Sequence, residues 1–167
     1  MSIIQVAPLP VGSFLGPYAQ DAANYVDCYR TTVPGHIDLA RFVATFFDSW
    51  IFRLERRLLA AFGQTGTSQG DVQALADGRS GGFAGWRVER RSDTQLLMSV
   101  RHDTIRTWLC IEPHPGDASR TDLYFGSAVV AVAAGPHGTK RRRRLATLLI
   151  PVHRLYSRIL LRAAARA

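Results

Sequence analysis

Hydrophobic positions near the end of the chain recur at the spacing of an amphipathic helix. Between residues 139 and 166, the apolar positions follow the three-and-four spacing that places side chains on one helix face. These positions are Leu145, Leu148, Leu149, Val152, Tyr156, Ile159, Leu160 and Ala163. Arg154, Arg158 and Arg162 fall together on the opposite side. Pro151 removes one backbone hydrogen bond within the run, so the pattern predicts a long, kinked C-terminal helix with one face to bury.

A different period, of two residues, begins at Phe83 and predicts strands. Four alternating runs follow one another, and short turn sequences separate them: GWRVERR, TQLLMSVR, TIRTWLCIE and TDLYFGSAVVAVA. Strands joined by short turns form an antiparallel meander. An earlier run at 24–32, closed by Pro34 and Gly35, predicts a first strand. It places Tyr25, Asp27 and Tyr29 on one face, with the alternate residues on the other.

The segment between the first strand and the meander has a helical pattern. Asp38 is a suitable N-cap for a run that ends at Phe62, with Gly63 just past its C-terminus. Asp48 and Ser49 offer a second cap, so both one helix and two shorter helices are compatible with the pattern. The polar connection that follows contains a predicted short helix at about 71–77.

Strands and helices in separate runs predict the α+β class. We expect an antiparallel sheet of about five strands, covered by a helical pair and by the C-terminal helix. Residues 1–23 hold five prolines and glycines, which predicts an irregular N-terminal arm, and residues 24–167 form one domain. A cystatin-like fold is the main structural alternative, but that fold places its long helix early in the chain.

The chain is basic, and its basicity is local. There are 21 Lys and Arg residues against 13 Asp and Glu residues, for a formal net charge of +8. Nine of the cations lie between residues 139 and 166, where no acidic residue occurs. The rest of the chain is close to neutral, so the excess charge describes one surface and not the whole protein.

Cysteine content and hydropathy predict a cytoplasmic protein without disulfides. Cys28 and Cys110 are the two cysteines, each within a predicted strand and without a histidine at metal-ligand spacing. We therefore expect buried, reduced thiols, no metal and no cofactor. The first residues lack the basic region of a signal peptide, and no run of 18 apolar residues occurs.

The order of elements from residue 24 to residue 166 resembles the helix-grip superfamily, which includes START domains, the birch-pollen allergen and polyketide cyclases. The terminal sequence LLIPVHRLYSRILL is similar to the kinked helix of uncharacterised bacterial members. The resemblance implies a curved sheet wrapped around the final helix, with an apolar cavity between them. The chain departs from that family in showing about five strands instead of six or seven, and it lacks a recognisable glycine-rich loop.

A cavity of this kind implies a binding site for a small hydrophobic molecule or lipid. The candidate ligand-binding residues are large side chains of the sheet and polar groups of the terminal helix: Tyr29, Trp86, Met98, Trp108, Phe125, His153 and Tyr156. Apolar walls with a few polar groups are typical of small-molecule sites. The same large residues also suit a packed core. Period two places Trp108 and Thr107 on opposite faces.

Catalysis has weaker support in the sequence. His36, His102, His114 and His137 fall in predicted turns, where solvated side chains are expected. His102 and Asp103 resemble a base with an orienting carboxylate, but no nucleophile is placed beside them. A polyketide cyclase or dehydratase-like enzyme is the catalytic alternative. It requires at least two polar or ionisable groups that converge in the cavity.

The basic run gives a third hypothesis. A cluster of five cations precedes the apolar stripe of the terminal helix and predicts contact with anions: Lys140, Arg141, Arg142, Arg143 and Arg144. Arginines beside free backbone N–H groups suit phosphate. The partner would be an anionic surface, either a membrane or a nucleic acid, although no nucleic-acid-binding motif accompanies the run. Hydrophobic ligand binding remains the leading hypothesis.

Overall fold

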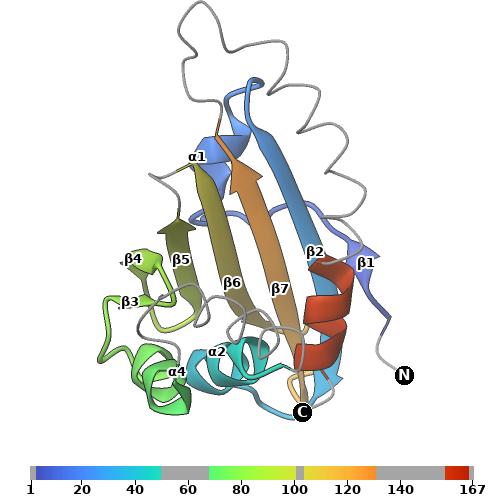
Figure 1. Ribbon diagram of the computed structural model, residues 1–167. Coiled ribbons are helices and arrows are strands. Elements are labelled where there is room, and N and C mark those ends of the chain that lie inside the picture. The colour runs from blue at the N-terminus through green and yellow to red at the C-terminus, as the bar shows by residue number, and fades with distance from the viewer. Residues whose placement is uncertain (1–2, 50–67, 101–103, 131–156, 166–167) are drawn as a thin grey trace, which may run out of the picture.

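Seven antiparallel strands form one sheet in the computed structural model, which describes residues 3–49, 68–100, 104–130 and 157–165 (Figure 1). The order of strands across the sheet is β1-β2-β7-β6-β5-β4-β3. Their bounds are β1 (Gln5–Val6), β2 (Tyr25–Pro34), β3 (Gly82–Phe83), β4 (Trp86–Arg91), β5 (Gln95–Val100), β6 (Ile105–Pro113) and β7 (Arg120–Val129). Strand β2 pairs with β7, so the first long strand lies beside the last one.

The long strands occupy the runs in which a period of two was predicted. Strand β2 extends the predicted strand to Pro34 and ends before Gly35, whose φ of 85° is favourable for glycine. The turn between β4 and β5 is closed by the Ser92 hydroxyl, which accepts hydrogen bonds from the backbone N–H groups of Thr94 and Gln95. Alternation along the chain and local turn chemistry together account for the meander.

The described residues between β2 and the meander include two helices. Helix α2 (Leu39–Phe47) begins after the predicted N-cap, because Asp38 Oδ1 accepts a hydrogen bond of 2.7 Å from the backbone N–H of Arg41. It ends at Phe47, next to the second possible cap, and the remainder of the predicted run, 50–62, lies outside the described residues. Helix α4 (Gln69–Ala76) corresponds to the short helix predicted at about 71–77.

The predicted five-stranded sheet around a long, kinked C-terminal helix is wrong. The sheet has seven strands. The sequence did not predict β1 and β3, because each has two residues and is too short to show alternation. The described residues contain four short helices: α1 (Gly16–Ala19), α2, α4 and the C-terminal helical residues 157–164. The rest of the predicted terminal helix, including Pro151, lies outside the described residues. None of the helices in the described part of the chain has the length and apolar character needed to cross a membrane.

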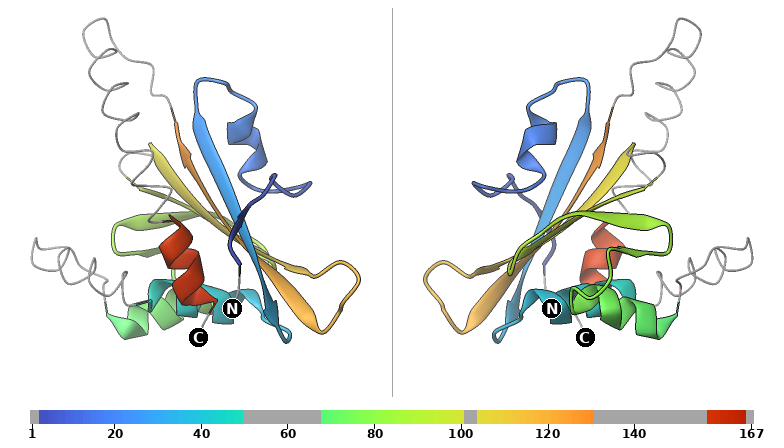
Figure 2. Two further views of the ribbon diagram at one scale, coloured as in Figure 1. Left: turned by 90° about the vertical axis from the view of Figure 1, so that its right-hand side faces the viewer. Right: turned by 90° about the vertical axis from the view of Figure 1, so that its left-hand side faces the viewer.

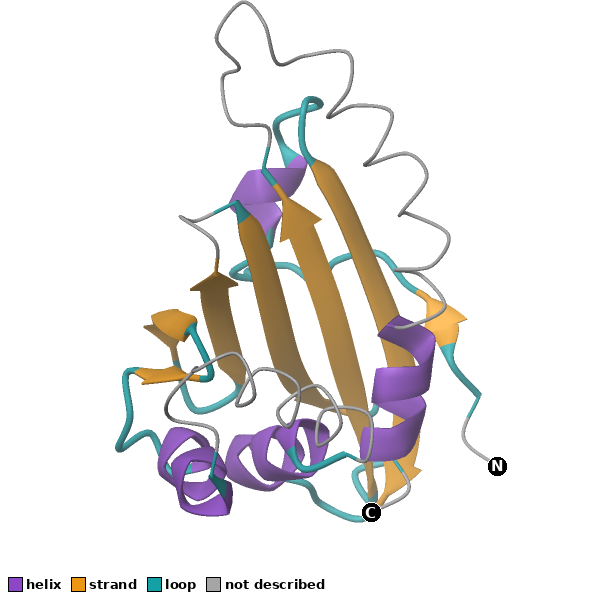
Figure 3. Cartoon of the chain, viewed as in Figure 1, coloured by secondary structure: helices purple, strands orange, loops and turns teal. Residues whose placement is uncertain are grey.

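The larger hydrophobic core lies between the sheet and the helices (Figure 3). Register places Tyr29, Phe125 and Leu109 side by side on β2, β7 and β6. Helix α2 contributes Phe46, whose ring centroid lies 5.1 Å from that of Phe125. It also contributes Phe47, whose ring centroid lies 5.3 Å from that of Phe83 on β3. Contacts of this kind combine burial of apolar surface with favourable ring geometry.

The C-terminal helical residues 157–164 cover β2 and β7 (Figure 1). Their buried positions follow helical spacing: Ser157, Leu160, Leu161 and Ala164. The buried face is therefore shifted by one residue from the predicted apolar face, because Ile159 is 37% exposed and Leu161 is fully buried. Arg158 and Arg162 are exposed, as their predicted position on the polar side requires.

The other face of the sheet is covered by the N-terminal segment, residues 7–19, which includes α1 (Figure 2). A second core forms here from Leu15, Cys28, Leu97, Trp108, Cys110, Tyr124 and Ala128. Gly126 of β7 lies under this layer, where an added Cβ would be 2.8 Å from Leu15 Cδ2 and 2.9 Å from the Asp27 carbonyl oxygen. Only glycine allows this close approach without displacing the backbone.

Polar contacts hold the N-terminal segment in place. Gln95 Oε1 accepts hydrogen bonds of 2.9 Å from the backbone N–H of Phe14 and from Trp108 Nε1. Farther along, the Tyr18 hydroxyl donates to Glu89 Oε2, and the Arg106 guanidinium bonds both oxygens of Glu89 at 3.1 Å. The segment predicted as an irregular arm thus contributes to the folded layers.

Cys28 and Cys110 are free, buried thiols in the second core, and we expect both to react slowly. Burial raises the pKa of each thiol from about 9 to about 12, with smaller effects of Asp27 and Glu112 on Cys28, and of Glu112 and Cys28 on Cys110. Because the thiolate is the reactive form, a disulfide reagent at pH 8 should modify the native protein at least about 100-fold more slowly than the unfolded chain. Rapid modification of either thiol in the native protein would contradict this burial.

The same raised thiol pKa values predict a pH dependence of stability. The unfolded chain loses its thiol protons near pH 9, whereas the folded protein retains them until about pH 12. The unfolded state therefore binds fewer protons in this window, and the free energy of unfolding should fall as pH rises from 9 to 12. Urea denaturation of the protein and of a Cys28→Ala, Cys110→Ala variant over this range measures the contribution, and the decline should be shallower in the variant.

Candidate functional site

The structure brings three of the predicted ligand-binding residues together. Tyr29, Met98 and Phe125 lie on the helix-covered face of the sheet, and Trp86 packs at the margin of the same core. Trp108 lies on the opposite face, because it pairs with Leu97 and Gly126 under the N-terminal segment. His153 and Tyr156 lie outside the described residues.

These three side chains are packed core residues. Tyr29, Met98 and Phe125 are each at most 3% exposed, and they are surrounded by side chains of α2 and of the C-terminal helical residues. Densely packed apolar side chains leave little room for a ligand. A site for a hydrophobic molecule must therefore lie where this packing is incomplete.

Packing is incomplete at one end of this core, where a groove of about 190 Å³ opens between the sheet, α2 and the C-terminal residues 164 and 165. We call it the apolar groove. Its lining residues come from the ends of β2 and β7, from α2 and its N-terminal connection, and from the C-terminus: Val33, Pro34, Ile37, Arg41, Phe42, Thr45, Leu123, Ala164 and Ala165. None of the predicted ligand-binding residues is among its described lining residues.

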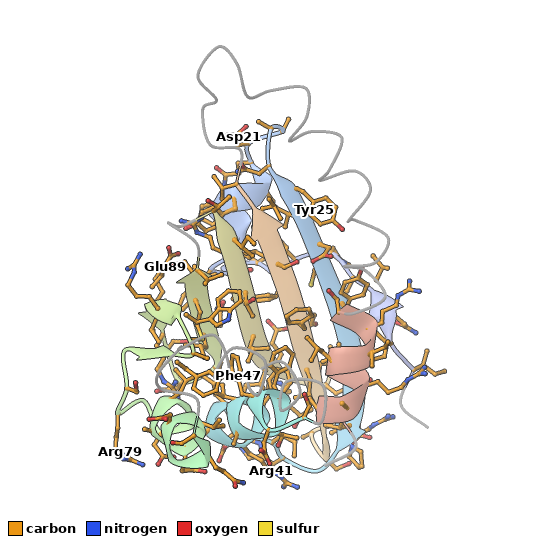
Figure 4. The ribbon with its side chains drawn as sticks, in the orientation of Figure 1. Asp21, Tyr25, Arg41, Phe47, Arg79 and Glu89 are labelled. Atoms are coloured by element: carbon orange, nitrogen blue, oxygen red, sulfur yellow. The ribbon has the colours of Figure 1, made fainter. Side chains whose placement is uncertain are left out.

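Local sequence explains the shape of the apolar groove. The period of α2 turns Phe42 toward the sheet and leaves Arg41 and Thr45 at the rim, where Arg41 is seen at the lower edge of the molecule (Figure 4). The connection before α2 is fixed by the backbone N–H of Ile37, which donates to Thr121 Oγ1 at 3.1 Å. Alanine at 164 and 165 provides space that larger side chains would fill.

The chemistry of the apolar groove favours binding over catalysis. Most of its walls are aliphatic or aromatic, and Arg41 and Thr45 supply the polar side chains. Thr45 Oγ1 donates its proton to the Arg41 carbonyl at 2.7 Å, so it is engaged within the helix. Among the described lining residues there is no carboxylate, imidazole or thiol to act as an acid, base or nucleophile.

A second hollow, of about 410 Å³, lies at the open edge of β2. We call it the polar pocket. Its lining residues come from β1 and the residues before it, from β2 and from both ends of the β6–β7 turn: Ile3, Gln5, Arg30, Thr31, Thr32, Pro34, His114 and Arg120. Strand β1 pairs only with Tyr29 and Arg30, so β2 has no strand partner beyond Arg30 on this side within the described residues.

A buried carboxylate contacts three residues that line the polar pocket. Asp122 on β7 is fully buried, and its Oδ1 accepts hydrogen bonds from Thr32 Oγ1 at 2.5 Å and from the His114 imidazole at 2.9 Å through Nδ1. Its Oδ2 lies 3.6 Å from the nearest Arg30 guanidinium nitrogen. A carboxylate in this position fixes the orientation of the imidazole ring and directs Nε2 away from itself.

Sequence reasoning missed this cluster. The position of His114 beside a proline predicted a solvated turn residue, yet its side chain is only 28% exposed and is bonded to Asp122. The available signal was Asp122 itself, an acidic residue inside a strand whose neighbours Leu123 and Tyr124 are apolar or aromatic. A carboxylate in a buried strand requires partners, and those partners mark a polar site.

The basic run, Lys140, Arg141, Arg142, Arg143 and Arg144, lies outside the described residues, so its contact with anions stays a prediction. The apolar groove and the polar pocket are candidate sites formed by described residues. None of the protein-family models, curated proteins or solved structures with which this chain was compared matches it.

Proposed function

We propose that this chain binds a small hydrophobic molecule in the apolar groove. The observation that carries the proposal is an apolar hollow of about 190 Å³ where the sheet, α2 and the C-terminal helical residues meet. An apolar cavity of roughly 150 Å³ is large enough to bind benzene. The groove therefore has room for a single ring or a short acyl chain.

The rim of the groove favours a ligand with one polar end. Arg41 is exposed at the rim, whereas Phe42, Ile37 and Leu123 provide apolar contacts inside. A planar guanidinium is well suited to a carboxylate. We therefore expect an aromatic or short aliphatic acid to bind more tightly than a neutral molecule of the same shape.

Binding is proposed in preference to the catalytic alternative. A polyketide cyclase or dehydratase-like reaction needs at least two converging ionisable groups, and Arg41 is the one ionisable side chain among the described residues that line the groove. Membership of the helix-grip superfamily stays a prediction, and the proposal does not depend on it. The proposed location is the cytoplasm, where the free thiols of Cys28 and Cys110 would be stable.

A substitution that fills the groove tests the proposal. Ala165 lines the groove and is partly buried, so Ala165→Phe should occupy the space of the ligand. Binding of benzyl alcohol, a neutral single-ring probe, should be measured by titration of backbone amide chemical shifts. We expect saturable shifts at Ile37 and Phe42 in the unmodified protein and at least tenfold weaker binding in the variant.

The matched control is Ala23→Phe, which adds the same ring at an exposed alanine away from the groove. This variant should bind benzyl alcohol as the unmodified protein does. A further variant, Arg41→Gln, should weaken binding of benzoate but leave binding of benzyl alcohol nearly unchanged. Equal binding of benzyl alcohol by Ala165→Phe and the unmodified protein would rule out the groove as its site.

A further inference from the structure

We propose that the polar pocket is a second binding site, which takes a small ligand bearing a carboxylate or phosphate group. The pocket lies at the edge of β2, and its charged lining residues are Arg30, His114 and Arg120. No acidic side chain is among its described lining residues. Guanidinium groups match the geometry of oxyanions and bind them through paired hydrogen bonds.

Asp122 positions the Arg30 guanidinium beside the pocket. The Arg30 guanidinium and Asp122 Oδ2 form an ion pair at 3.6 Å, which is longer than a normal hydrogen bond, and Arg30 also bonds the Tyr124 side chain. The side chain of Arg30 is 35% exposed, whereas that of Asp122 is 1% exposed. Glu112 pairs with Asp122 across β6 and β7 but does not line the pocket.

Buried oxygens without a hydrogen-bond partner occur near the pocket, on opposite faces of the sheet. Three buried side-chain oxygens in the described residues have no hydrogen-bond partner, and two of them are Thr31 Oγ1 and Asp122 Oδ2. Thr31 lines the pocket and is 2% exposed. A buried polar atom without a partner is costly and requires an explanation. The Thr31 side chain points to the helix-covered face with those of Tyr29 and Val33, so the inference does not rest on its hydroxyl.

The size of the pocket indicates a metabolite rather than a free ion. A volume of about 410 Å³ falls within the range of roughly 300–1,000 Å³ that is typical of small-molecule sites. Arg30 and Arg120 would bind the anionic group, and the rest of the ligand would contact Ile3, Gln5 and Pro34. Pairing of β1 with Arg30 places the N-terminal residues at this edge.

Two anions and two variants of equal charge test the inference. Inorganic phosphate and succinate are titrated separately into the full chain at fixed ionic strength, and the backbone amide shifts of Thr31, Thr32 and His114 are followed. Arg120→Gln removes a lining cation, while Arg162→Gln removes an exposed cation that does not line the pocket. Both variants lower the net charge by one.

We expect at least one of the anions to produce saturable shifts at these three residues, and the tighter one identifies the oxyanion. Loss of a charge-assisted hydrogen bond should raise its Kd about tenfold in Arg120→Gln, with less than a twofold change in Arg162→Gln. Benzyl alcohol binding in the apolar groove should be unaffected by either variant. The inference is overturned if neither anion shifts these residues, or if Arg162→Gln weakens binding as much as Arg120→Gln.

Discussion

Replacement of Phe46 by alanine is expected to lower the free energy of unfolding by about 3–5 kcal/mol. Phe46 is fully buried, and its ring lies 5.1 Å from the ring of Phe125 and 5.3 Å from that of Phe47, between centroids. Truncation removes apolar burial and leaves a cavity between α2 and the sheet. Domains are stable by only about 5–15 kcal/mol, so this single change would remove a large share of the total.

Urea denaturation followed by circular dichroism measures this loss. The conservative variant Phe46→Leu keeps most of the apolar volume and should cost less than about 1.5 kcal/mol, which separates cavity formation from a general intolerance of substitution. A loss below about 1 kcal/mol for Phe46→Ala would show that α2 does not pack on the sheet through this ring.

Leu15→Ala should cost about 2–5 kcal/mol, although Leu15 belongs to a segment rich in proline and glycine. Its side chain is fully buried and lies against Gly126, Trp108 and Cys28 in the second core. The substitution removes contacts with the sheet, including those with Trp108. A cost of this size would establish that residues 7–19 are part of the cooperative fold.

Val11 provides the matched control for Leu15. It lies four residues earlier in the same segment and is fully exposed, so Val11→Ala should change the free energy of unfolding by less than about 0.5 kcal/mol. Thermal or urea denaturation of both variants gives the comparison. Equal and small effects of the two substitutions would indicate that the N-terminal segment does not cover the sheet in solution.

Alternation of apolar and polar residues was sufficient to predict the long strands. Strands β2 and β4 to β7 have six or more residues each, long enough for a period of two to be visible. The opposite orientations of Tyr29 and Cys28, and of Thr107 and Trp108, follow directly from that period. The start of α2 was also predictable, because Asp38 is a local N-cap signal.

Features that depend on contacts between distant segments could not be predicted. Strands β1 and β3 have two residues each, and they are defined by their partners rather than by their own pattern. Register decides which aromatic residues share a face, and one slip exchanges the faces. For this reason Trp108 was grouped with Tyr29 and Phe125, from which the sheet separates it.

Both candidate sites also depend on contacts between residues that are not neighbours in the sequence. The apolar groove joins residues as far apart as Val33, Leu123 and Ala164, and its volume depends on the small side chains at its C-terminal wall. The polar pocket requires His114 and Asp122 to meet across the β6–β7 turn. The residue types are visible in the sequence, but their proximity depends on the fold.

The most direct test of the proposed function is the position of a bound ligand. Nuclear Overhauser effects should be measured between the ring protons of benzyl alcohol and the methyl groups of the isotopically labelled protein. The proposed function predicts contacts with Val33, Ile37 and Leu123, which line the apolar groove. Contacts confined to methyl groups of the opposite face, such as those of Val26 and Leu97, or no contacts at saturating ligand, would contradict it.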